Sequence, residues 1–173
     1  MGMRKISLLA ALCLPVASNA QEVLVEAESF ADHGGWSLDT QFIDIMGSPY
    51  LLAHGLGESV KNATTEVTFP KKGEYHVWVR TLNWVEKFSD HVNALAAPGR
   101  FQVKVGDTLI DHEFGTEGRE WHWEKGGAIQ VEELATTLAL HDLTGFEGRC
   151  DAILFSSNPD FVPDNSSEVL PAW

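Results

Sequence analysis

The sequence predicts an all-β protein, most simply an antiparallel β-sandwich. About eight short segments alternate apolar and polar residues with a period of two, which is typical of half-buried strands. Turn-forming glycine, proline and aspartate residues separate these segments at regular intervals. No segment keeps a helical period over about eleven residues, so helices are not expected to build the core.

The expected strands begin with residues 23–30, where Glu26 and Glu28 point to one face because neighbouring side chains of a strand alternate. Residues 101–105 and 108–110 flank Gly106-Asp107, whose leading glycine suits a two-residue type II′ hairpin turn. The other expected strands span residues 63–69, 74–82, 121–123, 128–132, 136–141 and 150–156.

Two long segments lie between these strands, residues 31–60 and 83–100. Closing a sandwich does not need loops of this length, and binding residues are often carried on such loops. These two segments are therefore candidates to carry some of the binding residues.

The first twenty residues have the pattern of a signal peptide. Arg4 and Lys5 precede an apolar run from residue 6 to 17, and small residues end it at Ala20. The sequence therefore predicts a signal peptide at 1–20, a sandwich domain at 21–157, and a polar, proline-bearing tail or linker at 158–173. The mature protein is expected to be secreted or periplasmic.

The chain is strongly acidic, with 12 basic and 25 acidic residues and a formal charge of -13. This charge disfavours nucleic acid and anionic membranes as partners, since both attract basic surfaces. No segment after residue 20 is apolar enough for membrane insertion. Cys150 is the only cysteine left after cleavage, so no internal disulfide is possible; we expect its thiol to be buried as a small apolar group.

Several motifs together resemble a known family. They are Glu26-Ala27-Glu28, Gly34-Gly35-Trp36, the segment 73–80 after Phe69-Pro70, the 103–106 hairpin and Asp151-Ala152-Ile153. This order resembles golvesin/xanthan-lyase-type carbohydrate-binding domains, related in pattern to family 6 and family 35 carbohydrate-binding modules. The resemblance implies a jelly roll of the galactose-binding-domain-like type that recognises glycans. It also implies a separate polysaccharide-degrading enzyme as a partner.

Three carboxylates form the candidate metal site: Glu26, Glu28 and Asp151, from the first and last expected strands. These strands are neighbours in the modules that the chain resembles, and the resemblance implies a structural calcium ion there. Carboxylate oxygens are suitable calcium ligands. The alternative is that the three acids cap turns or pair with surface lysine and arginine.

Six tryptophans are present, and their settings predict different roles. Trp36 lies in a glycine-rich loop and Trp84 just beyond a strand, so both are candidate platforms for stacking a sugar ring. Trp78 lies mid-strand and is expected in the core. Trp121 and Trp123 suit either the core or a platform.

The polar run 141–149 supplies the other candidate binding residues. Asp142 and Arg149 are expected to line a cleft with His54, Arg80 and Asn83. Arg149 would hold a uronic-acid carboxylate through two parallel hydrogen bonds. The alternative is that Asp142 and Arg149 pair with each other and only hold the loop.

These features predict an exported, non-catalytic protein that binds a polysaccharide or oligosaccharide. An alternative is a small polysaccharide lyase acting on uronic acid, for which a cation, a base and an acid are needed. A further alternative is a protein-interaction module that docks through Trp84. The sequence contains neither a Gly-x-Ser-x-Gly nor a His-Glu-x-x-His motif. The residues available to a lyase are Tyr50, His54, Arg80, His141, Asp142 and Arg149.

Overall fold

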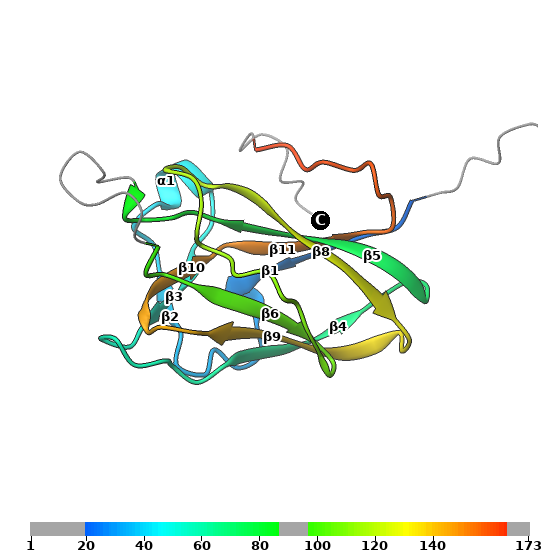
Figure 1. Cartoon of the computed structure of the whole chain (residues 1–173), viewed down its shortest axis with the longest axis horizontal. Coiled ribbons are helices and arrows are strands. Elements are labelled where there is room, and N and C mark those ends of the chain that lie inside the picture. The colour runs from blue at the N-terminus through cyan, green and yellow to red at the C-terminus, as the bar shows by residue number, and fades with distance from the viewer. Residues whose placement is uncertain (1–19, 87–96, 166–173) are drawn as a thin grey trace, which may run out of the picture.

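The computed structural model describes residues 20–86 and 97–165, and it confirms the all-β sandwich. Figure 1 shows its antiparallel sheets, which have the strand orders β1-β11-β5-β8, β4-β9-β6-β7 and β10-β3-β2. The strands are β1 Glu22–Glu26, β2 Ser37–Asp39, β3 Tyr50–His54, β4 Ala63–Thr68, β5 Gly73–Thr81, β6 Phe101–Val105, β7 Thr108–Leu109, β8 His122–Val131, β9 Ala135–Asp142, β10 Phe146–Cys150 and β11 Ala152–Ser156.

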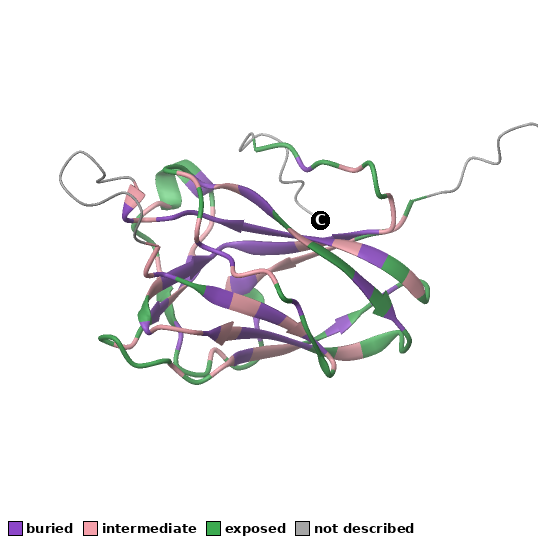
Figure 2. Cartoon of the chain, viewed as in Figure 1, coloured by how far each residue is buried: buried purple, intermediate pink, exposed green. Residues whose placement is uncertain are grey.

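The core lies between the two four-stranded sheets (Figure 2). Every second residue of the central strands is buried in it, as the alternation predicts: Val77 and Val79 from β5, and Leu138 and Leu140 from β9. The short sheet β10-β3-β2 continues this core at one end of the sandwich, where β3 contributes Leu51 and Ala53.

The hairpin at Gly106-Asp107 has the predicted length, because Val105 pairs with Thr108 across it. Gly106 has a φ of 58°, whereas Asp107 is not in the left-handed region. A positive φ at the first central residue alone is the pattern of a type II′ turn.

Some expected boundaries are wrong. The first strand ends at Glu26, and Glu28 falls in the 3-10 helix η1 (Ala27–Ser29). Residues 31–60 contain β2, the short helix α1 (Ile43–Met46) and β3. The sequence pattern did not predict β3, because Tyr50 and Leu51 point to opposite faces and both are buried, so apolar and polar residues do not alternate. The strand expected at 150–156 is interrupted at Asp151, because Cys150 ends β10 and β11 begins at Ala152. The two strands expected at 121–123 and 128–132 form one continuous strand, β8.

Residues 158–165 fold back onto the outer face of the sheet β1-β11-β5-β8. The indole N–H of Trp123 donates to the Asp164 carbonyl (3.1 Å), and the Trp123 amide donates to Asn165 Oδ1 (3.0 Å). Trp78 is buried as expected, yet it belongs to this outer cluster with Trp123 and not to the core between the sheets. The C-terminal residues 166–173, including Trp173, and residues 1–19 of the expected signal peptide lie outside the described residues.

The expectation about Cys150 is met. Cys150 is fully buried, and this burial raises the pKa of its thiol well above the usual value. Within 20–86 and 97–165, no helix has the length and apolar character needed to cross a membrane.

Candidate functional site

A cleft of about 300 Å³ with both polar and apolar walls opens where β2, β3 and β10 meet the end of β5. Its walls carry one tryptophan, two carboxylates, one arginine and one primary amide. The lining residues are Asp39, Gln41, Phe42, Leu52, Leu82, Trp84, Glu147 and Arg149. Trp84 and Arg149 were both predicted as ligand-binding residues, so the structure brings these two together.

Two contacts fix the Trp84 side chain, one at the indole N–H and one over the ring. Its indole N–H donates to the Phe146 carbonyl (3.1 Å), and the Arg149 guanidinium lies 5.6 Å from the ring centroid, within the range of a cation–π contact. The side chain is half-buried, so part of the ring reaches the cleft. An aromatic ring fixed in this way can stack a ligand without first losing rotamer freedom.

Arg149 is committed mainly to Glu147. Its Nη1 donates to the Glu147 carbonyl (2.8 Å) and its Nη2 to Glu147 Oε2 (3.3 Å). Glu147 Oε1 in turn lies 3.2 Å from His54 Nδ1. Glu147 has a φ of 63°, which is unusual for a residue with a side chain and coincides with an irregularity in the β10–β3 pairing. The bulge turns its carboxylate toward Arg149 and His54.

Tyr50 lies below this network and is fully buried. Burial raises the pKa of its phenol to about 12, so the group is neutral at physiological pH. Its hydroxyl lies beside the Arg149 and Asp39 side chains, whose effects on this pKa oppose each other. Its ring packs edge-on against Trp121, with a centroid separation of 4.9 Å. Trp121 is thereby assigned to a buried cluster, with Met46 and Leu82 as its other buried members.

Trp36 is not the exposed platform that its glycine-rich loop suggested. Its side chain is only 4% exposed and packs edge-on against Phe101 in the main core, with a centroid separation of 5.5 Å. The backbone of the loop is tied to residue 61, since the Gly35 amide donates to the Lys61 carbonyl. The tight loop therefore directs the indole inward.

Asp142 and Asn83 are buried and have structural partners. Asp142 accepts hydrogen bonds from the amides of Val60, Thr144 and Gly145, so it holds the 143–146 turn and makes no pair with Arg149. The Asn83 side chain accepts from the Val85 amide (3.2 Å) and donates to the Thr116 carbonyl (3.3 Å). Neither side chain lines the cleft.

The residues proposed for a lyase come together only in part, since Tyr50 and His54 lie near the Arg149–Glu147 pair and the others do not. Arg80 is buried and pairs with Asp151 (3.2 Å), while His141 lies 3.0 Å from Asn62 Oδ1. Of the six candidates, only Arg149 lines the cleft. Sequence reasoning missed Asp39, Gln41, Phe42 and Leu52 as binding residues, because single residues in a long segment carry no spacing signal. It also did not assign Leu82, at the end of an expected strand, or Glu147 to the binding site.

The predicted acidic cluster does assemble. One oxygen from each of Glu26, Glu28 and Asp151 lies within 4.8 Å of the others, at the junction of β1, η1 and β11. The Ala27 amide donates to the Asp151 carbonyl (2.8 Å), which brings the two chain segments together. Ser48 Oγ donates to Asp151 Oδ1 (3.3 Å) and adds another oxygen to the group.

Burial and mutual repulsion disfavour the charged forms of these carboxylates. Burial, aided by the charges of its neighbours, raises the pKa of Glu26 to about 7, and burial raises that of Asp151 to about 6 despite the Arg80 guanidinium. One buried oxygen on each of Glu26 and Glu28 has no hydrogen-bond partner within the described chain. Crowded, unsatisfied carboxylate oxygens suit the oxygen-rich shell of Ca²⁺.

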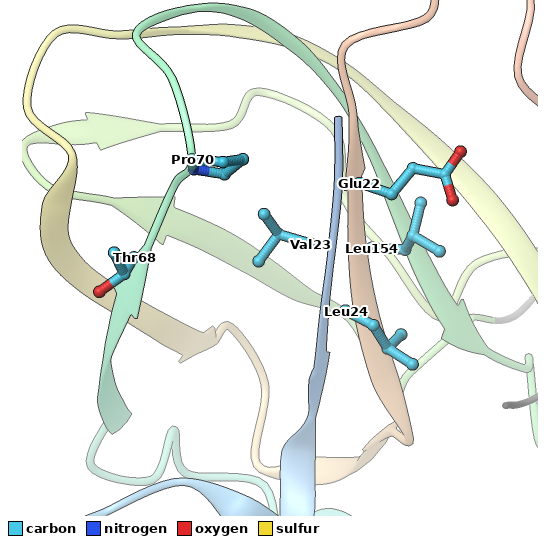
Figure 3. Close-up of a pocket in the computed structure, with 6 residues that line it drawn as sticks. All are labelled: Glu22, Val23, Leu24, Thr68, Pro70 and Leu154. Atoms are coloured by element: carbon cyan, nitrogen blue, oxygen red, sulfur yellow. The ribbon is translucent and has the colours of Figure 1, made fainter. Parts of the chain in front are cut away.

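A larger cavity has a different character. Figure 3 shows it between β1 and the end of β4, with a volume of about 480 Å³. Val23, Leu24, Leu154 and Pro70 make most of its wall, and Glu22 and Thr68 are its polar members. It contains no aromatic ring, so it lacks the platform expected of a sugar site.

No protein-family model and no curated protein matches this sequence. Solved structures do match the fold. A GH26-CBM35 β-(1,4)-mannanase from Podospora anserina has a TM-score of 0.59 at 18% identity, over 83% of this chain and 30% of the mannanase. A family 35 carbohydrate-binding module from Clostridium thermocellum has a TM-score of 0.58 at 16% identity, over 78% of this chain and 96% of the module.

The chain has the β-sandwich fold of family 35 carbohydrate-binding modules. A third match is the CBM36-1 domain of a multidomain xylanase from the hindgut metagenome of Trinervitermes trinervoides, with a TM-score of 0.55 at 12% identity, over 81% of this chain and 99% of that domain. The chain thus spans less than a third of the mannanase but corresponds to nearly the whole of each isolated module. This confirms the resemblance to family 35 modules at the level of fold.

Proposed function

We propose that this chain binds a carbohydrate non-covalently in the cleft between Trp84 and Glu147. The observation that carries the proposal is the half-buried Trp84 ring, fixed by the Phe146 carbonyl and Arg149, in a cleft rimmed by polar groups. Sugars combine apolar C–H patches with hydroxyls, and an aromatic face with a few placed polar groups complements both. The fold shared with carbohydrate-binding modules supports the same function.

The preferred ligand is a neutral sugar. Both Nη atoms of Arg149 already donate to Glu147, so the carboxylate of a uronic acid would have to compete with Glu147 for this guanidinium. Asp39 and Glu147 add two negative charges to the wall, and these repel an acidic sugar. Their oxygens can accept hydrogen bonds from neutral hydroxyls, while the exposed Gln41 amide can donate and accept.

Binding without catalysis is the preferred mode. Asp39 and Glu147 are the carboxylates of the cleft, but Glu147 is held by Arg149 and by His54. We further propose that the protein is exported and acts beside a separate polysaccharide-degrading enzyme. The mannanase and xylanase that contain similar modules support this partnership.

The acidic cluster is proposed to hold a structural calcium ion. Glu26, Glu28 and Asp151 would supply carboxylate ligands, and the ion would join the start of the sandwich to its last strand. A bound cation compensates the cost of burying three neighbouring carboxylates.

The test is a screen of the purified chain against neutral and acidic glycans with calcium present, followed by calorimetry on the best ligand. We expect a neutral glycan to bind and Trp84→Ala to weaken its affinity at least tenfold, in line with about 1.4 kcal/mol for a lost aromatic contact. Trp84→Phe should retain part of the affinity.

Val162→Ala is the matched control, because it shortens an exposed apolar side chain away from the cleft. It should bind like the unaltered chain. Failure to bind any glycan, or equal affinity in Trp84→Ala, contradicts the proposal. The appearance of unsaturated products from uronic-acid polymers would instead support the lyase.

A further inference from the structure

The proposed sugar cleft lies on the outer face of the short sheet β10-β3-β2, and this face continues beyond the cleft. Leu52 of β3 lines the cleft and pairs with Arg149 of β10. Two residues further along β3, His54 pairs with Phe146. Side chains two residues apart on a strand share a face, and so do directly paired residues. His54 and Phe146 therefore lie on the cleft side of the sheet, next to the residues that line the cleft.

The Phe146 side chain is exposed but fixed in place. The residue is 48% exposed. Its carbonyl accepts the indole N–H of Trp84 (3.1 Å), and its amide donates to Thr144 Oγ1 (3.2 Å), so its backbone is held on both sides. The ring lies against Gly57, where an added Cβ would be in van der Waals contact with it at 3.5 Å. A ring held in this way can stack a ligand at little cost in rotamer entropy.

The loop that follows β3 places another apolar side chain beside this ring. The amides of Gly55 and Gly57 both donate to the Gly145 carbonyl (2.9 and 3.2 Å), which binds the loop to the turn that precedes Phe146. Leu56 is 82% exposed at a φ of 55°, a left-handed conformation that is rare for a residue with a side chain. Single exposed apolar side chains are ordinary, but neighbouring ones on firmly bonded backbone beside a cleft indicate a contact surface.

His54 supplies a polar group to this surface. Its Nδ1 lies 3.2 Å from Glu147 Oε1, and its side chain is 49% exposed. An ionised carboxylate can only accept a hydrogen bond, so Nδ1 carries the proton, and Nε2 of the neutral ring is left as an acceptor. Because Glu147 lines the cleft, this contact joins the cleft to the surface around Phe146.

We propose that Phe146, His54 and Leu56 form a second sugar subsite, so that the chain binds consecutive units of a glycan. This inference rests on the proposed function, since the first unit is the one that stacks on Trp84. Phe146 would stack the apolar C–H face of the next unit, and His54 Nε2 would accept a hydrogen bond from one of its hydroxyls. Two residues of an extended strand span about 7 Å, which is close to the length of one pyranose unit in a chain.

Continuity with the cleft decides the occupant of this surface. Phe146 and Leu56 present one ring and one aliphatic side chain next to the polar groups of His54 and Glu147. That combination is on the scale of a sugar unit and is small for a protein interface. The ligand class that follows is an oligosaccharide, or an internal stretch of a neutral polysaccharide, and not a lone monosaccharide.

The test is calorimetric titration with neutral mono-, di- and trisaccharides of the mannan, xylan and cellulose series, with calcium present. We expect the affinity in the best series to rise at least about fivefold from the monosaccharide to the disaccharide. Phe146→Ala should remove this gain and leave the monosaccharide affinity unchanged, because the carbonyl that holds Trp84 belongs to the backbone and remains. Phe146→Tyr should keep the gain.

Leu109→Ala is the matched control, because Leu109 is also an exposed apolar residue and lies on β7, in another sheet. It should keep every affinity of the unaltered chain. NMR titration gives a readout that needs no variant: the disaccharide should shift the amide signals of Phe146 and Gly57, and the monosaccharide should leave them in place.

Two kinds of failure are distinguishable. Equal affinity for mono-, di- and trisaccharides, or an unchanged gain in Phe146→Ala, overturns the second subsite, while an affinity that depends on Trp84 still supports the proposed function. If none of these sugars binds, both proposals fail. An effect of Phe146→Ala on self-association alone, measured by analytical ultracentrifugation with sugar affinities unchanged, would overturn the subsite and identify a contact between copies of the chain.

Discussion

At the scale of single residues, neighbours in the sequence take opposite roles. Trp84 lines the cleft, while Asn83 beside it is buried and holds the backbone. Likewise, Arg149 lies across the Trp84 ring, while Asp142 in the same polar run accepts hydrogen bonds from backbone amides. Residue type identified candidates for the binding site. The direction of each side chain decided whether it lines the cleft or holds the backbone around it.

Asp142 should be important for stability although it does not line the cleft. It is 1% exposed and accepts from three amides, so Asp142→Ala leaves those buried donors unsatisfied. We expect the free energy of unfolding to fall by about 2–3 kcal/mol. Sugar affinity should also fall, since the turn held by Asp142 carries the Phe146 carbonyl that fixes Trp84.

Urea unfolding and calorimetry measure the two effects. Asp142→Asn should be milder, because it keeps one acceptor oxygen. Asp160→Ala, at an exposed position, should change stability by no more than about 0.5 kcal/mol. If Asp142→Ala were as stable as the unaltered chain, Asp142 would not hold this turn.

At the scale of elements, the acidic cluster lies at a junction between strands. The acidic cluster exists because β1 ends at Glu26 and turns into η1, which brings Glu28 back toward Asp151 between β10 and β11. A longer first strand, as the sequence predicted, would also have put Glu26 and Glu28 on one face. The turn from β1 into η1 also brings the Glu26 and Glu28 carboxylates close together, although they do not lie on one strand.

Removal of calcium should destabilise this junction. With calcium at about 100 times its Kd the ion contributes about 2.7 kcal/mol, so a calcium chelator should lower Tm by roughly 5–10 °C. Glu28→Gln should reduce this difference, because it removes one charged ligand. Differential scanning calorimetry with and without chelator gives the comparison.

Glu74→Gln is a suitable control, since Glu74 is exposed on β5 and outside the acidic cluster. Its response to chelator should equal that of the unaltered chain. A chelator that leaves every Tm unchanged would show that the three carboxylates hold no stabilising calcium.

At the scale of the whole molecule, the described part of the C-terminal segment completes the sandwich. The row Leu24, Leu154 and Trp78 crosses β1, β11 and β5 on the outer face of one sheet, and Trp123 on β8 extends this apolar surface. Residues Asp164 and Asn165 bond to Trp123 at its edge. The expected division between a domain at 21–157 and a tail or linker at 158–173 stays a prediction. Within the expected tail, the segment 158–165 contacts the sheet.

A chain that ends after Ser157 tests this contact. It loses both acceptors of Trp123, so we expect Trp78 and Trp123 to become more exposed, with a red-shifted tryptophan emission and a loss of about 1–3 kcal/mol of stability. Asn165→Ala should give a smaller shift, because the Asp164 carbonyl remains. Identical emission and stability in the shortened chain would contradict a structural role for residues 158–165.

Much of the fold could be predicted because strands buried on one face leave an alternating pattern. The pattern located β4, β5, β6 and β9 to within a few residues. It missed β3, which is buried on both faces, and β10, whose polar and glycine-rich sequence resembles a loop. The cleft was predicted only in part, because its lining comes from four separate segments joined by pairing across the β10-β3-β2 sheet.

The sequence by itself determined the sandwich, the acidic charge, the carboxylates at the two ends of the domain and the supply of aromatic residues. Tertiary structure decided which aromatic could meet a ligand: Trp36 entered the core, Trp78 and Trp123 were covered on the outer face, Trp121 packed on Tyr50, and Trp84 remained in an open cleft. The physical reason is that alternation assigns a side chain to one face of a strand. What covers that face depends on segments far away in the chain.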